Sequence, residues 1–307
     1  MNIAIVGPGA IGLLLSGYLH RAGARLSVID HDPERMEILE KRIRWQGITG
    51  DFSFSVPVAL GLQEPEKTDL VIICVKAYDT DSVARQLSAA GYRGAVMTLQ
   101  NGVDNPEIIR RRLPDSPLIA GITSEGAYLA AVDHVRHAGK GKTAFGRVGA
   151  DEPKDGFLNE ILALFRAAGL DAELSSEPIA LIWSKALLNA GINALTAILG
   201  VRNGELLRIE PARALMARLV IECWQVLKAK GIAPVYEDPV SRVEEVCRMT
   251  AENYSSMYMD IKNRRRTEID FINAAIVREA DRLEIACPYN QAITQLIKAL
   301  EQKGAIR

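Results

Sequence analysis

The chain has no excess of charge of either sign. Of its 307 residues, 37 are Lys or Arg and 38 are Asp or Glu, which gives a formal net charge of −1. Proteins that bind nucleic acid usually carry a basic field. Only 6% of the residues are aromatic, which leaves few rings on which bases could stack. The composition therefore argues against a nucleic-acid partner.

Cysteine and long apolar runs are also scarce. None of the four cysteines belongs to a C-x-x-C pair, so we expect free thiols, a reducing compartment and no metal site. The apolar start runs at once into glycines, unlike a secretory signal. No apolar run is expected to approach the roughly 20 residues of a membrane span. We therefore expect a cytoplasmic protein with no membrane partner.

The length of the chain and its 48% hydrophobic content suit two cores rather than one. Short β-branched runs, glycine turns and helical patterns alternate up to residue 176. After Pro178 the strand signal nearly vanishes, and helical patterns occupy residues 179–199, 211–230, 239–254, 259–283 and 289–302. We predict an α/β domain over 1–176, with a Rossmann-type doubly wound parallel sheet, and an all-helical domain over 177–307.

A glycine-rich turn follows the first predicted strand, residues 2–6, and precedes a helix that ends near Gly23. Its G-x-G-x-x-G pattern is typical of dinucleotide binding in this strand–turn–helix setting. The glycines allow a tight turn, close approach of a pyrophosphate and close helix packing, and the helix N-terminus attracts phosphate. The predicted cofactor-binding residues are Gly7, Gly9, Ala10, Ile11 and Gly12. A glycine turn without a ligand is the alternative.

Three polar residues follow other predicted strands. Asp30 ends the strand 26–30, Lys76 follows the strand 69–75, and Asn101 follows the strand 94–99. Ligands of open parallel sheets bind beyond the carboxyl ends of the strands, so all three are candidate cofactor residues. For Lys76 the alternative is a solvated strand end, and for Asn101 a plain Asn-Gly turn.

A polar stripe runs along the otherwise apolar segment 182–193. Lys185, Asn189 and Asn193 are spaced i, i+4 and i+8, which places them near one face of a helix. A lysine and two amides among apolar residues are costly unless they face water, a partner or a ligand. We interpret the stripe as the wall of a cleft near the domain junction, a common place for ligand sites. A solvated stripe on a surface helix is the alternative.

The segment 254–273 holds a second polar cluster. Glu268 shares a predicted helical face with apolar residues, so we expect it to point inward. Ser256 lies twelve residues earlier, and the two reach one site only if a turn separates them. We interpret Arg264–Arg266 as a solvated face or helix-start ion pairs rather than a phosphate site. His134 and His137 are expected at the surface or at a pocket rim, since no third metal ligand is evident.

Taken together, these motifs resemble the ketopantoate reductase (2-dehydropantoate 2-reductase) family over nearly the whole chain. The resemblance rests on the glycine turn, Val75–Ala77, Gln100–Gly102, the run Trp183–Asn193, and Ser255–Met257 followed by Thr267–Asp270. It implies a Rossmann domain that binds NADPH and a helical domain that closes over it. It implies Lys185 as the general acid and Glu268 as the residue that holds and orients the substrate. It implies substrate contacts from Asn101, Asn189, Asn193 and Ser256.

One position departs from the family pattern. Where NADPH-dependent members usually carry an arginine after the second strand, this chain has His31 between Asp30 and Asp32. A carboxylate there accepts hydrogen bonds from the ribose diol and repels a 2′-phosphate. Arg35 would soften that repulsion if it folded back. The family default is NADPH, whereas Asp30 favours NADH.

The resemblance therefore implies NAD(P)H-dependent reduction of 2-dehydropantoate, a small 2-keto acid, to (R)-pantoate, a step of pantothenate and coenzyme A synthesis. One alternative is a reductase of another 2-keto or imino acid on the same scaffold. Another is a non-catalytic dinucleotide sensor, although a sensor needs no proton donor such as Lys185. The apolar faces of the helical domain make a homodimer plausible.

Overall fold

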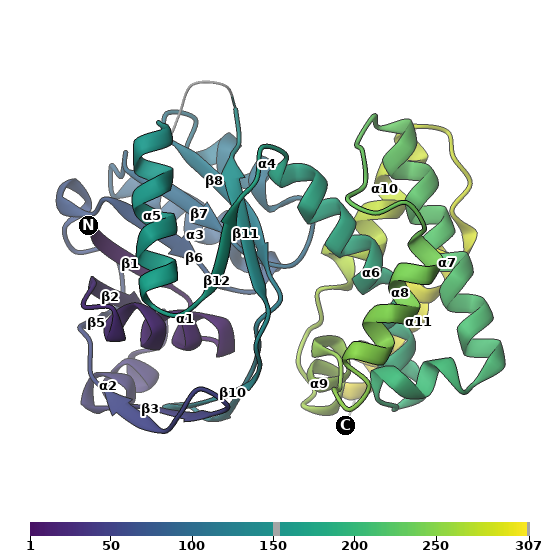
Figure 1. Cartoon of the computed structure of the whole chain (residues 1–307), viewed down its shortest axis with the longest axis horizontal. Helices are drawn as coiled ribbons and strands as arrows, with labels where there is room; N and C mark the ends of the chain where they lie inside the picture. The colour runs from purple at the N-terminus through teal and green to yellow at the C-terminus, as the bar shows by residue number, and fades with distance from the viewer. Residues whose placement is uncertain (150–153, 306–307) are drawn as a thin grey trace. The chain divides into compact units, whose positions relative to one another are not determined.

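The computed structural model describes residues 1–149 and 154–305, which form two compact units (Figure 1). The first unit contains residues 1–100 and 105–179. The second contains residues 101–104 and the chain from Ala180 onward. The boundary between the units thus falls three residues after the predicted one. The short segment 101–104 leaves the first unit and groups with the second, which no sequence pattern indicated.

An eight-stranded sheet forms the centre of the first unit. Its strand order is β12-β11-β8-β7-β6-β1-β2-β5, in which β11 pairs antiparallel with β8 and all the other pairs are parallel. The six strands from β5 to β8 follow the doubly wound order, so the predicted Rossmann-type fold is confirmed. The strands are β1 Asn2–Val6, β2 Arg25–Ile29, β5 Val58–Ala59, β6 Leu70–Ile73, β7 Ala95–Thr98, β8 Leu118–Thr123, β11 Lys142–Arg147 and β12 Asp171–Leu174.

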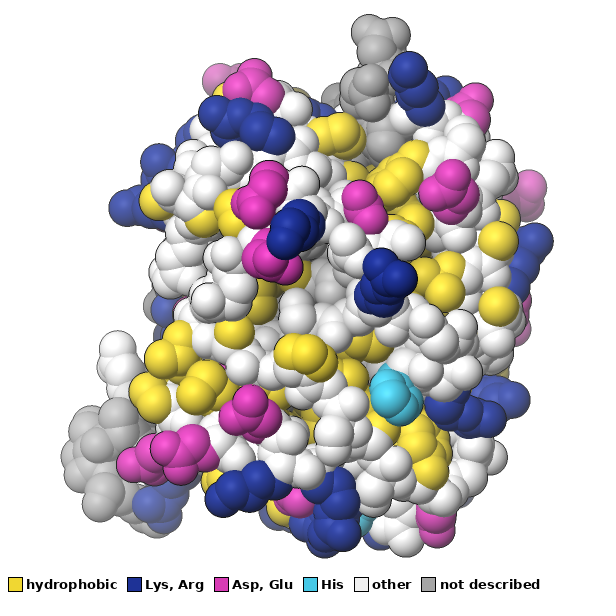
Figure 2. All heavy atoms as spheres, turned by 90° about the vertical axis from the view of Figure 1, so that its left-hand side faces the viewer, with side chains coloured by type: hydrophobic (Ala, Val, Ile, Leu, Met, Phe, Trp, Pro, Cys, Tyr) yellow, Lys and Arg dark blue, Asp and Glu magenta, His cyan; other side chains and the backbone are white. Residues whose placement is uncertain are grey.

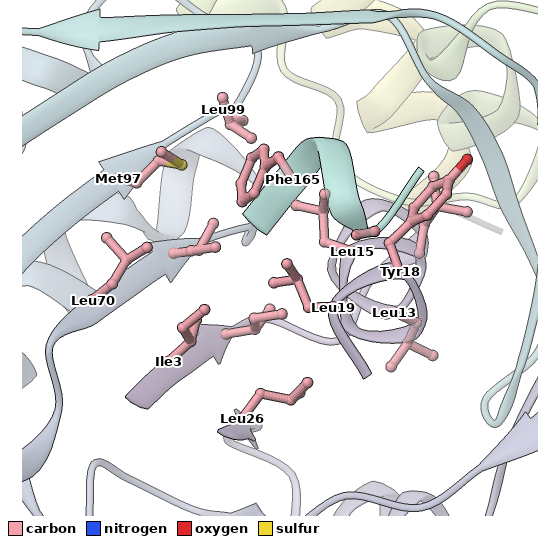
Figure 3. Close-up of a cluster of buried hydrophobic side chains, with 14 of the residues drawn as sticks. Ile3, Leu13, Leu15, Tyr18, Leu19, Leu26, Leu70, Met97, Leu99 and Phe165 are labelled. Atoms are coloured by element: carbon pink, nitrogen blue, oxygen red, sulfur yellow. The ribbon is translucent and has the colours of Figure 1, made fainter. Parts of the chain in front are cut away.

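Helices cover both faces of this sheet, because each buried strand sends alternate side chains to opposite sides. Ile3 and Ile5 of β1 face α1 and α5, whereas Ala4 and Val6 belong to the core under α3 and α4. Figure 3 shows Leu19 of α1 among the side chains of the strands. The helices are α1 Ala10–Arg21, α2 Pro33–Lys41, α3 Thr80–Ala89, α4 Asn105–Arg112 and α5 Asp155–Ala167, with 3-10 turns η1 Pro65–Lys67 and η2 Ala77–Asp79.

A smaller four-stranded sheet has the strand order β4-β3-β10-β9. Its strands are β3 Ile43–Gly47, β4 Phe52–Phe54, β9 Gly126–Ala131 and β10 His134–Gly139. The expectation that His137 lies at the surface or a pocket rim was wrong. Its side chain points inward from β10, with Nε2 2.6 Å from Oε2 of buried Glu125 and Nδ1 2.7 Å from the Thr49 hydroxyl.

The second unit is all-helical apart from its turns, as predicted. It contains α6 Pro178–Leu199, η3 Asn203–Leu207, α7 Glu210–Ala229, α8 Pro239–Met249, α9 Ser256–Lys262, η4 Ile269–Phe271, α10 Asn273–Arg282 and α11 Pro288–Ala305. The single helix expected over 259–283 was wrong, since it is α9, η4 and α10. The run 262–267 has no apolar side to bury, and Arg264 takes a φ of 53°, a left-handed conformation that ends a helix.

Helix α6 is the core helix of the second unit. Among the described residues it is the one helix long and apolar enough to span a membrane by length and composition. The expectation that no apolar segment approaches that length was therefore wrong. However, 72% of its most apolar stretch is buried inside the protein, as in the core helix of a globular domain.

The face of the molecule drawn in Figure 2 carries Lys and Arg side chains interspersed with Asp and Glu. Hydrophobic side chains occur among them singly or in small groups. This mixture follows from the near balance of 37 basic and 38 acidic residues. No field of a single sign forms on this face.

Candidate active site

The three glycines of the turn in the first unit differ in the space that each leaves for a side chain. Gly7 has a φ of 94°, and a Cβ there would lie 2.6 Å from Cγ1 of Val75. A Cβ on Gly12 would lie 2.1 Å from the Gly7 carbonyl oxygen. At Gly9, by contrast, a Cβ would meet nothing within 4 Å. Gly9 therefore borders open space at the start of α1, where a pyrophosphate can approach the backbone.

The N-terminus of α1 suits an anion. The helix begins at Ala10, its first turn contains no acidic residue, and its N-cap Gly9 makes no side-chain hydrogen bond to it. Free backbone N–H groups and the helix dipole together favour phosphate at such a position. Ala10 and Ile11, which were expected in the glycine turn before the helix, are instead its first residues, and both are partly exposed.

Asp30 lies directly after β2, and its side chain is almost fully buried. Its Oδ1 accepts hydrogen bonds from the backbone N–H groups of His31 and Asp32, at 2.7 and 3.3 Å. Its Oδ2 accepts no hydrogen bond from the described residues, although it forms an ion pair with Arg35 Nε at 3.2 Å. A buried carboxylate oxygen without a donor fits the ribose diol of a dinucleotide.

Arg35 folds back toward the glycine turn, which is the arrangement in which we expected it to soften the repulsion of a 2′-phosphate. Its Nη2 donates to the carbonyl oxygen of Pro8 at 3.0 Å, while Nε faces Asp30. The guanidinium thereby bridges the Asp30 carboxylate and the glycine turn. It brings a positive charge next to the Asp30 carboxylate.

The ends of β6 and β7 are joined by Gln100. Its Nε2 donates to the Val75 carbonyl oxygen at 2.7 Å and to the Thr80 hydroxyl at 2.9 Å. Lys76 comes directly after Val75, is partly buried and starts the turn η2. The Gln100 side chain therefore holds the chain on both sides of Lys76, which lies beyond the carboxyl ends of the strands.

The polar stripe of the second unit lies on one continuous helix, α6. Lys185 and Asn189 are partly buried, and Asn193 is 7% exposed, whereas neighbours such as Ala186 and Leu187 belong to the core. Burial lowers the pKa of Lys185 to about 8, and the Glu268 carboxylate opposes this shift. A lysine with a pKa near 8 is a competent proton donor at neutral pH.

Glu268 precedes the turn η4 and is 6% exposed, so the predicted inward orientation is correct. Asn101, which lies in the same unit, places its Nδ2 3.4 Å from Glu268 Oε2. The segment of Asn101 is held by a hydrogen bond from Val103 N to Phe271 O at 3.2 Å. The second unit therefore brings together three predicted site residues, Lys185, Glu268 and Asn101.

The adjacent serines Ser255 and Ser256 have different roles. The Ser255 hydroxyl caps α9 by accepting from Tyr258 N at 3.1 Å, and it accepts from Thr196 of α6 at 2.7 Å. Ser255 is therefore committed to the fold and ties the start of α9 to the end of the stripe. Ser256 is the first residue of α9 and is exposed. Its hydroxyl is the better placed of the two for a ligand.

Comparisons with known proteins bear on this geometry. A model of the ketopantoate reductase PanE/ApbA family matches residues 3–150, and a model of the C-terminal part of that family matches residues 177–301. The chain belongs to the ketopantoate reductase family. The 2-dehydropantoate 2-reductase of Halobacterium salinarum is 33% identical over 99% of this chain and 100% of its own length. That of Archaeoglobus fulgidus is 36% identical over 98% of each chain.

Solved structures agree with the sequence comparison. The PanE/ApbA family ketopantoate reductase from Ralstonia eutropha JMP134 superimposes with a TM-score of 0.89 at 31% identity, over 99% of this chain and 100% of that one. A D-mandelate dehydrogenase solved with NADH and anilino(oxo)acetate gives 0.92 at 27% identity over the full length of both chains. The ketopantoate reductase fold thus also occurs in a dehydrogenase of a different 2-hydroxy acid.

Two residues that support this ketopantoate reductase site had not been predicted. Ser255 stands at an N-cap position, a signal that the sequence contains. Glu301 accepts from the backbone N–H of Thr267, next to Glu268, at 2.6 Å, and no local pattern reveals such a contact. Among the residues that the structure describes, no group of three or more His, Cys, Asp or Glu side chains is arranged to hold a metal ion.

Proposed function

We propose that this chain is a 2-dehydropantoate 2-reductase that reduces the C2 ketone of its substrate to the alcohol of (R)-pantoate, with a reduced nicotinamide dinucleotide. The observation that carries the proposal is Lys185, whose pKa burial lowers to about 8, beside the buried Glu268 carboxylate. A sensor that only binds a dinucleotide has no need of a proton donor tuned to neutral pH. The full-length relatives of the same name support this choice over other 2-keto acids.

The residues divide the chemistry among them. When bound, the reduced nicotinamide supplies the hydride. Lys185 donates a hydrogen bond and then a proton to the carbonyl oxygen as negative charge develops there, a role typically worth 10²–10⁴-fold in rate. Glu268 accepts a hydrogen bond from the terminal hydroxyl of 2-dehydropantoate. The neutral donors Asn101, Asn189, Asn193 and Ser256 bind the substrate, with its carboxylate as the principal acceptor.

A second candidate is a reductase of a different 2-keto acid, which the likeness to a D-mandelate dehydrogenase favours. Glu268 distinguishes the two candidates. A substrate that lacks the terminal hydroxyl cannot donate a hydrogen bond to the Glu268 carboxylate, and a site built to bind a hydroxyl rejects such an analogue strongly. We therefore expect kcat/KM for 2-dehydropantoate to exceed that for the keto acid of mandelate. The reverse order would favour the second candidate.

For the cofactor we propose a preference for NADH. Asp30 Oδ2 is buried and lacks a hydrogen-bond donor among the described residues, so it suits the unphosphorylated ribose. Arg35 is the residue that would hold a 2′-phosphate if NADPH were preferred, since its guanidinium already lies beside Asp30. Separate assays with NADH and NADPH at matched concentrations decide between the two.

The proposal includes a homodimer formed through the helical unit. Several large apolar side chains of this unit are exposed, among them Met249 at 71% and Leu296 at 53%. Light scattering of the purified protein measures its mass directly. A mass of one chain at micromolar concentration would contradict this part of the proposal and leave the reaction untouched.

A further inference from the structure

Asn273, the first residue of α10, is completely buried and joins three helices. Its Nδ2 donates to the backbone carbonyl oxygen of Ala190 on α6, at 3.1 Å, and to Oδ1 of Asn290 on α11, at 3.0 Å. Ala190 lies between Asn189 and Asn193 of the polar stripe. The side chain of Asn273 therefore fixes the start of α10 against the middle of the helix that carries Lys185.

Asn290 is itself held rigidly. It is fully buried, and its Nδ2 donates to the Leu219 carbonyl oxygen and to Glu222 Oε2, at 3.1 and 2.7 Å. The Glu222 carboxylate also accepts from the backbone N–H groups of Tyr289 and Asn290, both at 2.9 Å. This network gives Asn273 a stationary partner on α11, because its members leave few alternative hydrogen bonds.

A short link connects Asn273 with Glu268, five residues earlier. Within it, Phe271 N donates to the Glu268 carbonyl oxygen at 3.0 Å, and Ile272 N donates to that of Ile269 at 3.4 Å. Helix α6 packs tightly against α7 one residue after Ala190. At Gly191 it packs so closely that a Cβ would lie 2.7 Å from Cγ1 of Val220.

We propose that Asn273 is a positioning residue that holds the Glu268 carboxylate in the position relative to Lys185 that the reaction requires. The inference rests on the proposed function, since it concerns the geometry of the same site. Asn273 touches neither the reacting atoms nor the substrate; it acts through Glu268. If Asn273 is truncated, one buried hydrogen bond to α6 and one to α11 are lost, and Glu268 moves away from Lys185.

The experiment compares Asn273→Ala with Asn203→Ala, a matched control in the same unit. Asn203 is also buried, its Nδ2 makes one hydrogen bond, to Thr250 Oγ1 at 2.9 Å, and its Oδ1, like that of Asn273, has no partner among the described residues. Both variants should lower the melting temperature. Only Asn273→Ala should lower kcat/KM for 2-dehydropantoate, by about 10- to 100-fold, because small misplacements of catalytic groups cost that much.

Two further readouts separate positioning from a merely structural role. In a Glu268→Gln background, Asn273→Ala should change kcat/KM by less than about twofold, because the group it positions is already lost. The basic limb of the pH profile of Asn273→Ala should move to lower pH, because Glu268 no longer raises the pKa of Lys185. If Asn273→Ala does not fold, Asn273→Ser, which keeps one hydrogen-bond donor, replaces it in the same comparison with and without Glu268→Gln.

Equal activity losses in Asn273→Ala and Asn203→Ala, or an undiminished effect of Asn273→Ala in the Glu268→Gln background, would overturn the inference. An unmoved pH profile would do so as well. Failure of the proposed function has a different signature, since the unsubstituted protein would then not turn over 2-dehydropantoate. In that case the shift of the Lys185 titration is followed by NMR of the lysine instead, and an unchanged titration in Asn273→Ala overturns the positioning role.

Discussion

Asn101 Nδ2 lies 3.4 Å from Oε2 of Glu268, which follows it 167 residues later in the chain. The two residues come from the loop after β7 and from the turn before η4, and both belong to the second unit. The same carboxylate acts on Lys185, where it opposes the lowering of the pKa by burial. An amide donor, a buried carboxylate and a lysine with a pKa near 8 thus form one electrostatic unit on which the proposed chemistry depends.

Lys185→Ala removes the proposed proton donor. We expect kcat for 2-dehydropantoate to fall by about 10²–10⁴-fold. The dissociation constant for the dinucleotide should stay within about twofold, because the predicted nucleotide residues other than Asn101 lie in the first unit. Steady-state kinetics and a fluorescence titration measure the two quantities. Lys228→Ala, at an exposed lysine on α7, is the control and should leave both unchanged. Turnover near normal in Lys185→Ala would remove Lys185 from its role.

The pH dependence should have opposite signs in the two directions of the reaction. Lys185 has a pKa of about 8, below its ordinary value of 10.5. Reduction needs the protonated lysine, so kcat/KM should fall as pH rises through about 8. Oxidation of pantoate needs the neutral lysine as a base, so its kcat/KM should rise over the same interval. If kcat/KM changed in the same direction with pH for reduction and oxidation, or if the midpoint of the change lay near pH 10.5, the assignment of Lys185 as the proton donor would be contradicted.

Glu268→Gln tests how the substrate is recognised. The variant should lose roughly 10²-fold or more in kcat/KM for 2-dehydropantoate, whose terminal hydroxyl no longer meets a carboxylate. For a branched 2-keto acid without that hydroxyl, the loss should be much smaller. The ratio of the two kcat/KM values is the measurement. Equal losses for both substrates would mean that Glu268 acts only through Lys185 and does not read the hydroxyl.

Cofactor choice should respond to Asp30 and Arg35 in opposite ways. Asp30→Asn removes the charge that we propose repels a 2′-phosphate, so the ratio of kcat/KM for NADPH to that for NADH should rise about tenfold or more. Arg35→Ala removes the cation beside it, so the same ratio should fall. Parallel kinetics with both dinucleotides provide the test. A fall of this ratio in Asp30→Asn would be inconsistent with our interpretation of Asp30.

Gly9→Ala and Gly12→Ala form a matched pair within the glycine turn. At Gly9 a Cβ meets nothing within 4 Å, so the variant should fold normally but bind the dinucleotide about tenfold or more weakly. At Gly12 a Cβ would lie 2.1 Å from the Gly7 carbonyl oxygen, so the free energy of unfolding should fall by about 3 kcal/mol or more. Denaturant melts and binding titrations distinguish the pair. Tight binding by Gly9→Ala would exclude a pyrophosphate at that place.

The elements that the sequence predicted well are those with a local cause. Buried strands are recognisable as β-branched runs, and the glycine turn has its strand and helix on either side, so the first unit was largely predictable. The stripe on α6 followed from helical spacing. By contrast, the break between α9 and α10 depends on Arg264 in a left-handed conformation, which few non-glycine residues adopt. The helical pattern over 259–283 continues across this break, so the sequence predicted a single helix there.

What escaped prediction depends on contacts between distant parts of the chain. His137 is buried because Glu125 and Thr49 satisfy both of its ring nitrogens, and neither partner is its neighbour in sequence. The hydrogen bond from Asn273 to Ala190 spans 83 residues. Such pairs leave no periodic signal, because burial of a polar group depends on a partner that only the folded chain brings near.

The most direct test of the account is the oxidation of NADH and of NADPH, followed separately, with 2-dehydropantoate as the substrate and pantoate identified as the product. We predict turnover with formation of pantoate, faster with NADH than with NADPH. Turnover that favours NADPH would contradict the interpretation of Asp30 but keep the reaction. No pantoate with either dinucleotide would contradict the central claim that this chain is a 2-dehydropantoate reductase.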